Sequence, residues 1–458
     1  MRSRRKILFA TVGALATVVA FAGCSATPTT AATNGKVSIT VAGLIPGSTK
    51  EAVAAFNARV TAFEKANPNI TLKSEEYQWT GPTFATQLAG GTLPDVFNVP
   101  FTDSKALIQK GQLADITSLV KALPYANKFN QNVLSEAENA GKIYGLPYGP
   151  YAMGLSYNRA LFTKAGLDPN KPPTTWAEVE QDAKIISTKL PGVAGYMQMT
   201  SGNTGGWELA ATTYARGGRL ESVNSSGKTV VKTDNTQTKA ALQFLHDLRW
   251  TDNAAGSNFL LDWSGINQAF GSGQIAMYVS GSDVLTSLVE TDGVNPTDYG
   301  LAPLPLTGKN SGVLSGGSVI AVSPKATAAQ KAAAVKWMDF YYIQPLVNKT
   351  QTVDAAKVLA ASNQPVGVPT LPVFNQATYN QQQQWIKPEV NIPLSNVAPF
   401  TSKIFTEPIV PEPNKDTQQL YGALDSVVQA VLTNKNANVD TLLKGVDSQI
   451  QALVDSGQ

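Results

Sequence analysis

The sequence predicts an α/β fold with parallel strands, and the N-terminal third of the chain carries the supporting pattern. Residues 37–42 (VSITVA) alternate apolar and polar side chains as a strand does, and residues 70–77 alternate again. Between them, apolar residues recur every three or four positions from Lys50, which predicts an amphipathic helix. A strand, a helix and a second strand in this order predict a parallel sheet. A length of 458 residues also predicts two domains.

The same pattern predicts where a ligand would bind. Ligands of parallel α/β sheets bind beside the carboxyl ends of the strands. The loops at residues 44–49 and 78–82 follow the two predicted strands. We therefore expect a binding cleft next to these loops.

Residues 1–23 have the parts of an export signal peptide. Four basic residues precede an apolar run over 7–22, and small residues lead to Cys24, the only cysteine of the chain. This segment resembles the lipobox of bacterial lipoproteins, although Phe21 stands where that pattern usually has Leu. We expect cleavage before Cys24 and attachment of a lipid to its thiol. An uncleaved anchor is the alternative, because the run reaches the ~17 residues needed to span a membrane. Export by the Sec or the twin-arginine route is left open.

Without its leader the chain is nearly neutral. Removing the four basic residues leaves 32 of the 36 Lys and Arg against 33 Asp and Glu, a net charge of about −1. A chain without a basic excess is not expected to bind nucleic acid, and a single cysteine permits no internal disulfide. Residues 25–35 (SATPTTAATNG) contain no large apolar side chain, so we expect residues 24–35 to be a flexible tether.

Three later segments carry helical signals, and we expect their apolar side chains to pack in the core. Thr175 and Glu178 form a capping box, which makes Trp176 a packing residue of a first helical turn. Residues 236–250 and 328–342 each carry one apolar face, and His246, the only histidine, falls on a solvated flank. The expected packing residues on these two helices are Ala241, Phe244, Leu245, Leu248, Val335, Trp337 and Met338.

Several short segments between residues 36 and 345 resemble, in order, the extracellular solute-binding proteins of ABC importers. The resemblance is to the carbohydrate-binding family that includes maltose-binding protein, and it thins between residues 350 and 411. The segments that carry it are AFEKANPNIT (62–71), LPDVF (93–97), GQLADI (111–116), YGLPY (144–148), LSYNRALF (155–162), AGLD (165–168), PTTWAE (173–178), FGSGQIAM (270–277), YGLAPLP (299–305), GGSVIA (316–321) and KWMDF (336–340).

The resemblance implies a two-lobe periplasmic-binding-protein fold of the Venus-flytrap type, in which the lobes close on the solute by hinge motion. Three hinge crossings would lie near residues 147–151, near 313–317 and within 383–395. One lobe would then comprise residues 36–148 and 317–390, and the other residues 149–316 and 391–458.

The resemblance also implies a function. The protein would capture a sugar or oligosaccharide outside the cytoplasm and deliver it to the permease subunits of an ABC transporter. We expect a monomer held at the membrane by the lipid on Cys24, with no cofactor and no metal.

Two other functions are weighed against this one. A binding protein for a polyamine or peptide would keep the fold and change the site. A carbohydrate-active enzyme would need paired carboxylates, which sequence does not place. We expect no enzyme, because a single histidine and the lack of HExxH and GxSxG motifs remove the common catalytic arrangements.

A sugar site needs flat aromatic side chains for the CH faces of the ring, with polar groups at their rims. Trp250, Trp176 and Trp337 lie in helical patterns and are expected to pack. The tryptophans in or beside predicted loops are candidate ligand contacts: Trp79, Trp207, Trp263 and Trp385.

Polar contacts are expected from side chains near the predicted cleft. Tyr151 stands where relatives place an acidic sugar contact, and Asp283 follows a Ser-Gly-Ser segment where the family often has Gly-x-Trp, so we expect an altered ligand. Gly317 would allow close backbone approach. Asp95 is expected to be structural. The remaining polar candidates are Gln78, Asn98, Asp103, Asn203, Ser318 and Glu412.

Overall fold

The computed structural model describes residues 35–457. The predicted leader, Cys24 and nearly all of the predicted tether lie outside these residues. Among residues 35–457, no helix combines the length and the apolar character that crossing a membrane requires.

The central element is a mixed sheet of eight strands within the described residues, in the order β10-β6-β11-β3-β1-β2, with β12 beside β11 and β9 beside β6. β1 runs parallel to β2 and to β3, and α1 connects β1 to β2, which confirms the predicted βαβ unit. The strands of the sheet are β1 (Val37–Leu44), β2 (Ile70–Glu76), β3 (Val96–Pro100), β6 (Gly145–Asn158), β9 (Met277–Gly281), β10 (Tyr299–Pro303), β11 (Val313–Val322) and β12 (Ile409–Pro411).

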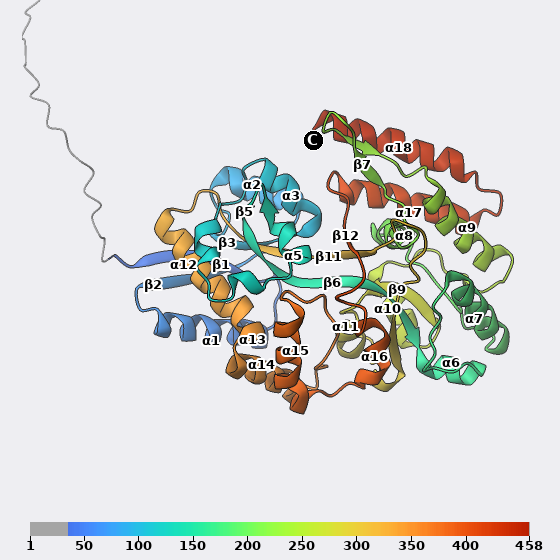
Figure 1. Ribbon diagram of the computed structural model, residues 1–458, viewed down its shortest axis with the longest axis horizontal. Coiled ribbons are helices and arrows are strands. Elements are labelled where there is room, and N and C mark those ends of the chain that lie inside the picture. The colour runs from blue at the N-terminus through green and yellow to red at the C-terminus, as the bar shows by residue number, and fades with distance from the viewer. Residues whose placement is uncertain (1–34, 458) are drawn as a thin grey trace, which may run out of the picture. The chain divides into compact units, whose positions relative to one another are not determined.

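β6 and β11 are the longest of these strands and lie side by side in the middle of the sheet (Figure 1). The first half of β6 pairs with β11, and its second half pairs with β9 and β10. The pairing shifts register between Gly316 and Ser318, where Gly317 has a φ of 143°. These strands contain residues 147–151 and 313–317, where the first two hinge crossings are predicted.

Helices cover the sheet on both sides of β6 and β11. Two small hairpins, β4 (Glu138–Asn139) with β5 (Lys142–Ile143) and β7 (Glu221–Val223) with β8 (Thr229–Val231), stand apart from the sheet. The α-helices are α1 (Lys50–Ala66), α2 (Gly81–Gly90), α3 (Phe101–Gln109), α4 (Thr117–Lys121), α5 (Gln131–Leu134), α6 (Arg159–Ala165), α7 (Trp176–Lys189), α8 (Thr204–Ala215), α9 (Thr236–Trp250), α10 (Trp263–Gly271), α11 (Leu285–Glu290), α12 (Ala328–Met338), α13 (Gln344–Val347), α14 (Lys349–Ala361), α15 (Gln376–Ile386), α16 (Leu394–Thr401), α17 (Thr417–Thr433) and α18 (Val439–Ser456).

The helical predictions hold with one difference. The capping box of Thr175 and Glu178 opens α7, and the expected packing residues of α9 and α12 are buried. α12 ends at Met338 rather than residue 342, and a π-helical turn (Asp339–Ile343) follows. This turn directs an aromatic run inward: Phe340 packs on Phe63, and Tyr342 packs on Tyr148.

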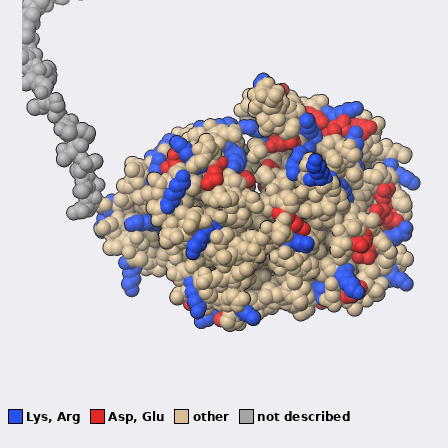
Figure 2. Space-filling view, viewed as in Figure 1, with Lys and Arg blue, Asp and Glu red and all other residues tan. Residues whose placement is uncertain are grey.

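Charged side chains of both signs are mixed on the visible face of the molecule (Figure 2). On the face shown in Figure 2, Lys and Arg are interspersed with Asp and Glu rather than gathered into one area of a single sign. His246 lies on the flank of α9 as expected, and its Nε2 is 3.0 Å from the Lys435 carbonyl oxygen.

Candidate functional site

Two adjoining cavities lie where β3, β6 and β11 meet α8 and α17. The first, here the Trp207 cavity, has a volume of about 340 Å³, and the second, the Trp79 cavity, has about 780 Å³. They share Pro100, Thr102, Asn203 and Gln418, so they form one elongated cleft. The Trp207 cavity is lined in addition by Gly149, Tyr151, Gly202, Thr204, Trp207, Asp283, Gly317, Ser318, Glu412 and Tyr421.

The position of Trp207 depends on an unusual start of α8. Asn203 at the N-cap has left-handed backbone angles (φ 68°, ψ −4°), and its own side chain makes no capping bond. Instead, Asp425 on α17 accepts hydrogen bonds from the backbone N–H of Asn203 (2.7 Å) and of Gly206 (2.8 Å). A carboxylate at this point satisfies amides that a helix leaves unpaired, and it complements the helix dipole.

Two glycines allow α8 to approach α17 closely. A Cβ atom at Gly206 would lie 2.2 Å from the Tyr421 carbonyl oxygen, and one at Gly205 would lie 2.8 Å from Asp425 Oδ1. No side chain fits at these distances without moving the helices apart. The Gly205-Gly206 pair therefore sets the depth at which Trp207 enters the cavity.

Glu208 holds the first turn of α8 from the other side. Its buried carboxylate accepts hydrogen bonds from the Tyr196 hydroxyl (3.1 Å) and from the backbone N–H of Met199 (2.8 Å) and Val279 (3.2 Å). Burial raises the pKa of Glu208 to about 8, although these donors oppose the shift. The bond to Val279 ties α8 to β9.

Tyr151 and Trp207 form the aromatic wall of the Trp207 cavity. Their rings meet edge to face, with centroids 5.9 Å apart. Tyr151 lies on β6 opposite Gly316 of β11, and a Cβ atom at Gly316 would lie 2.1 Å from the Tyr151 hydroxyl oxygen. Burial, with the negative charges of Glu412 and Asp283 nearby, holds the pKa of Tyr151 well above its ordinary value, so its hydroxyl stays protonated.

The two carboxylates of the Trp207 cavity have few partners. Glu412 is 8% exposed, and its Oε1 accepts a hydrogen bond from the Tyr421 hydroxyl (3.2 Å). Burial raises the pKa of Glu412 to about 8, and the charges of Glu136 and Asp103 add to the shift. Burial also raises the pKa of Asp283. Both carboxylates are placed to accept hydrogen bonds from a ligand.

The Trp79 cavity presents a second aromatic side chain beside a carboxylate. Trp79 packs on Phe84 of α2 with ring centroids 5.0 Å apart. Asp103 accepts a hydrogen bond from the Thr102 hydroxyl (2.7 Å), and burial raises its pKa. The lining also includes Lys110 and Lys415, so this part of the cleft carries both signs of charge.

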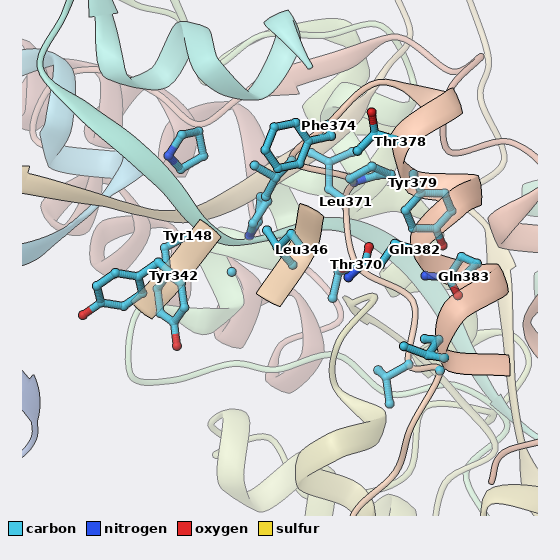
Figure 3. Close-up of a pocket in the computed structure, with 18 residues that line it drawn as sticks. Tyr148, Tyr342, Leu346, Thr370, Leu371, Phe374, Thr378, Tyr379, Gln382 and Gln383 are labelled. Atoms are coloured by element: carbon cyan, nitrogen blue, oxygen red, sulfur yellow. The ribbon is translucent and has the colours of Figure 1, made fainter. Parts of the chain in front are cut away.

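A third cavity, of about 280 Å³, lies beside the first half of β6 (Figure 3). It is here the Tyr379 cavity, and its aromatic walls include Tyr148 and Tyr342 on one side and Tyr379 on the other. Gln382 and Gln383 add amides, and none of the described residues that line it is charged. Gly149 lines both this cavity and the Trp207 cavity. Aromatic rings and amides also suit a polyol, so the Tyr379 cavity is the alternative site.

Comparison with known proteins identifies the family. A family model described as bacterial extracellular solute-binding protein matches residues 46–342. The chain belongs to this family. The multiple sugar-binding protein of Streptococcus mutans serotype c is 25% identical over 327 residues, which cover 68% of this chain and 73% of that protein.

Solved structures show that this solute-binding protein has the predicted two-lobe fold. The cyclic alpha-maltosyl-1,6-maltose binding protein from Arthrobacter globiformis matches with a TM-score of 0.69 and 20% identity, covering 92% of this chain and 100% of that one. UgpB from Mycobacterium tuberculosis, in complex with glycerophosphocholine, matches with a TM-score of 0.69 and 18% identity, covering 92% and 99%. The fold class and the family expected from the sequence are confirmed.

The structure brings most of the candidate site residues of this solute-binding protein into one cleft. Two lie in its Trp79 portion, Trp79 itself and Asp103. Asn203 lines both cavities. Those that line the Trp207 cavity alone are Tyr151, Trp207, Asp283, Gly317, Ser318 and Glu412.

Four candidates line none of the three cavities. Gln78 is exposed beside Trp79. Asn98 lies within β3, where it pairs with Ile320 of β11, and of this strand only the last residue, Pro100, lines the cleft. Trp263 is the first residue of α10 and is 38% exposed. Trp385 lies in α15 rather than in a loop, because the glutamines before it continue the helix.

Other cleft residues were not predicted. Gln418 and Tyr421 stand three residues apart on α17, so they share one face of that helix. Gln418 Oε1 accepts a hydrogen bond from Asn203 Nδ2 (3.2 Å). The three-residue spacing of Gln418 and Tyr421, shortly after the candidate Glu412, is the sequence signal that could have identified them. Pro100, Thr102 and Thr204 carry no distinctive pattern.

Proposed function

We propose that this protein binds a carbohydrate in the Trp207 cavity and delivers it to the permease of an ABC transporter. The observation that carries the proposal is the juxtaposition of the Tyr151 and Trp207 rings with the carboxylates of Asp283 and Glu412. A sugar ring presents apolar CH faces to aromatic side chains and hydroxyls to acceptors at their rims. Charge-assisted hydrogen bonds to carboxylates are roughly twice as strong as neutral ones.

The length of the cleft favours more than one sugar unit. The Trp207 and Trp79 cavities adjoin, and each has an aromatic side chain next to a carboxylate. One sugar ring would pack against Trp207 and a second would lie toward Trp79, so the ligand would occupy both cavities. The names of the multiple sugar-binding protein of Streptococcus mutans and the cyclic alpha-maltosyl-1,6-maltose binding protein of Arthrobacter globiformis support this choice of ligand class.

Transport follows from closure of the lobes. A ligand that contacts residues of β6, β11 and α8 together stabilises the arrangement in which these elements are close. The permease then distinguishes the closed, loaded form from the open one. The protein acts as a monomer outside the cytoplasm, held by a lipid on Cys24, and it leaves the sugar chemically unchanged.

A titration panel tests the proposal. Mono-, di- and oligosaccharides are added to the purified protein while tryptophan fluorescence is recorded, and each hit is measured by calorimetry. Saturable binding of at least one sugar with roughly one site per chain is expected. Recovered sugar is then analysed for new reducing ends, which should not appear. A panel in which no sugar binds, or in which a bound sugar is cleaved, contradicts the proposal.

A further inference from the structure

The Trp207 cavity contains acidic side chains and no basic ones. Asp283 and Glu412 are its charged residues, and no Lys or Arg is among the described residues that line it. Glu136, which is 5% exposed, and Asp103 lie close enough to repel the charge of Glu412. A buried carboxylate without a cationic partner is costly. Without a ligand the cavity has no internal cation among its described residues to stabilise an ionised Glu412, and its carboxyl group keeps a proton near neutral pH.

Two lysines in this region, Lys105 and Lys415, have partners outside the Trp207 cavity. Lys105 donates hydrogen bonds to the carbonyl oxygens of Ser135 and Glu138. Lys415 Nζ is 3.3 Å from Gln109 Oε1 and lines the Trp79 cavity. Neither takes part in an ion pair with Glu412 within residues 35–457.

The two carboxylates retain acceptor capacity toward the cavity. Glu412 has its one side-chain partner, Tyr421, on Oε1, so within the described residues Oε2 accepts no hydrogen bond. Within residues 35–457, no other residue donates a hydrogen bond to the Asp283 carboxylate. Asp283 Oδ1 and the Tyr151 ring both pack beside Gly281, where an added Cβ atom would lie 2.7 Å and 3.1 Å from them. A carboxylate thus stands beside the aromatic wall.

Resting on the proposed function, we propose that the sugar bound in the Trp207 cavity carries a protonated amine, which lies between Asp283 and Glu412. The ammonium supplies the counterion that the cavity lacks, so that Glu412 releases its proton when the amine binds, and it donates three hydrogen bonds. The faces of Tyr151 and Trp207 attract a cation as well. Sugar phosphates and uronic acids are disfavoured, because their negative charge meets two carboxylates.

Sugars that share a skeleton and differ in one group separate the effect of the amine's charge from the effect of shape. The β-1,4-linked glucosamine disaccharide, its N,N′-diacetyl form and cellobiose share one skeleton and differ in bearing an amine, an amide or a hydroxyl. Galactosamine, N-acetylgalactosamine and galactose form a second such set, and maltose is included as a neutral disaccharide of different linkage. Calorimetry at pH 6.5 is expected to give at least tenfold tighter binding of an amine than of its matched amide and hydroxyl forms. Raising the salt concentration should weaken that preference.

Two variants test whether the preference for an amine comes from the carboxyl groups of Glu412 and Asp283. Glu412→Gln and Asp283→Asn keep the shape of the cavity and should each weaken binding of the amine more than binding of its matched neutral sugar, so that the amine preference falls at least fivefold. Asp168→Asn serves as the control, because Asp168 is an exposed residue in a surface ion pair with Lys171. This variant should leave the amine preference unchanged. Melting temperatures verify that each variant is folded.

The possible results separate the inference from the proposed function. Neutral sugars that bind as tightly as their amines, in every set, overturn the inference and leave the proposed function standing. An amine preference that survives both carboxylate variants also overturns it. Binding of spermidine with no sugar bound at all overturns the proposed function and the inference together.

Discussion

Asp425 caps a helix that begins more than two hundred residues earlier in the chain. Its carboxylate on α17 accepts hydrogen bonds from Asn203 N–H at 2.7 Å and from Gly206 N–H at 2.8 Å, at the start of α8. Trp207 follows directly. The aromatic wall of the cleft is therefore positioned by a residue that does not line the cavity, and this dependence can be measured.

Replacing Asp425 with Ala should lower both stability and affinity. Loss of a helix cap costs about 1–2 kcal/mol, and the freed first turn of α8 would no longer hold Trp207 in place. Asn375→Ala is the matched control, since it removes the cap of α15, away from the cleft. Chemical denaturation should show a loss for both variants, whereas calorimetry should show weaker sugar binding for the Asp425 variant alone. Equal affinity of the two variants would contradict the positioning role.

Replacing Gly206 with Ala should force α8 away from α17. The new methyl group would overlap the Tyr421 carbonyl oxygen, and overpacking of this kind costs about 1–3 kcal/mol. Gly445→Ala on α18 is the control, because nothing lies within 4 Å of a Cβ atom there. That substitution should stabilise the protein by about 0.4–1 kcal/mol. A Gly206 variant as stable as wild type would show that the two helices separate at little cost.

Stability should fall as the pH rises from 5 to 8. Burial raises the pKa of Glu412 from 4.5 to about 8, so over this range the folded chain holds a proton that the unfolded chain has released. Unfolding then releases that proton, and the free energy of unfolding decreases by about 1.4 kcal/mol per pH unit for one such group. Glu208 acts in the same direction. Glu412→Gln should flatten the pH profile measured by denaturation, and an unchanged slope would place the effect elsewhere.

Cys24 tests the proposed attachment separately from binding. A Cys24→Ser variant should appear in the soluble fraction with the same sugar affinity as the wild-type protein, because the described residues that line the cleft begin at Trp79. Fractionation and calorimetry measure the two properties. Retention of the variant on the membrane would favour an uncleaved N-terminal anchor.

Sequence patterns were sufficient for the fold and for structural polar residues. The βαβ signal at residues 37–77 gave the correct pairing of β1 with β2. Asp95, expected to be structural, accepts hydrogen bonds from the Thr40 backbone N–H (2.8 Å) and hydroxyl (3.2 Å). Local patterns predict such features because the interactions that create them are periodic or short in range.

Long-range packing explains what sequence reasoning missed in the cleft. Asn98 was a candidate contact, but it lies inside β3 and pairs with Ile320 of β11, and only Pro100 at the end of that strand lines the cleft. Gln418 and Tyr421 lie beyond a segment where the family resemblance is thin. Asp425 affects the site only through α8, a contact that no local pattern reveals.

The most direct test compares sugar affinity in three variants by calorimetry with the tightest sugar found for the wild-type protein. Trp207→Ala removes the aromatic wall of the proposed site, Trp263→Ala removes a tryptophan outside the cavities, and Gln383→Ala alters the Tyr379 cavity (Figure 3). The expectation is at least a tenfold loss of affinity for Trp207→Ala, equivalent to about 1.4 kcal/mol, and little change for the other two variants. Wild-type affinity in the Trp207 variant, together with a loss in the Gln383 variant, would contradict it and place the sugar in the Tyr379 cavity.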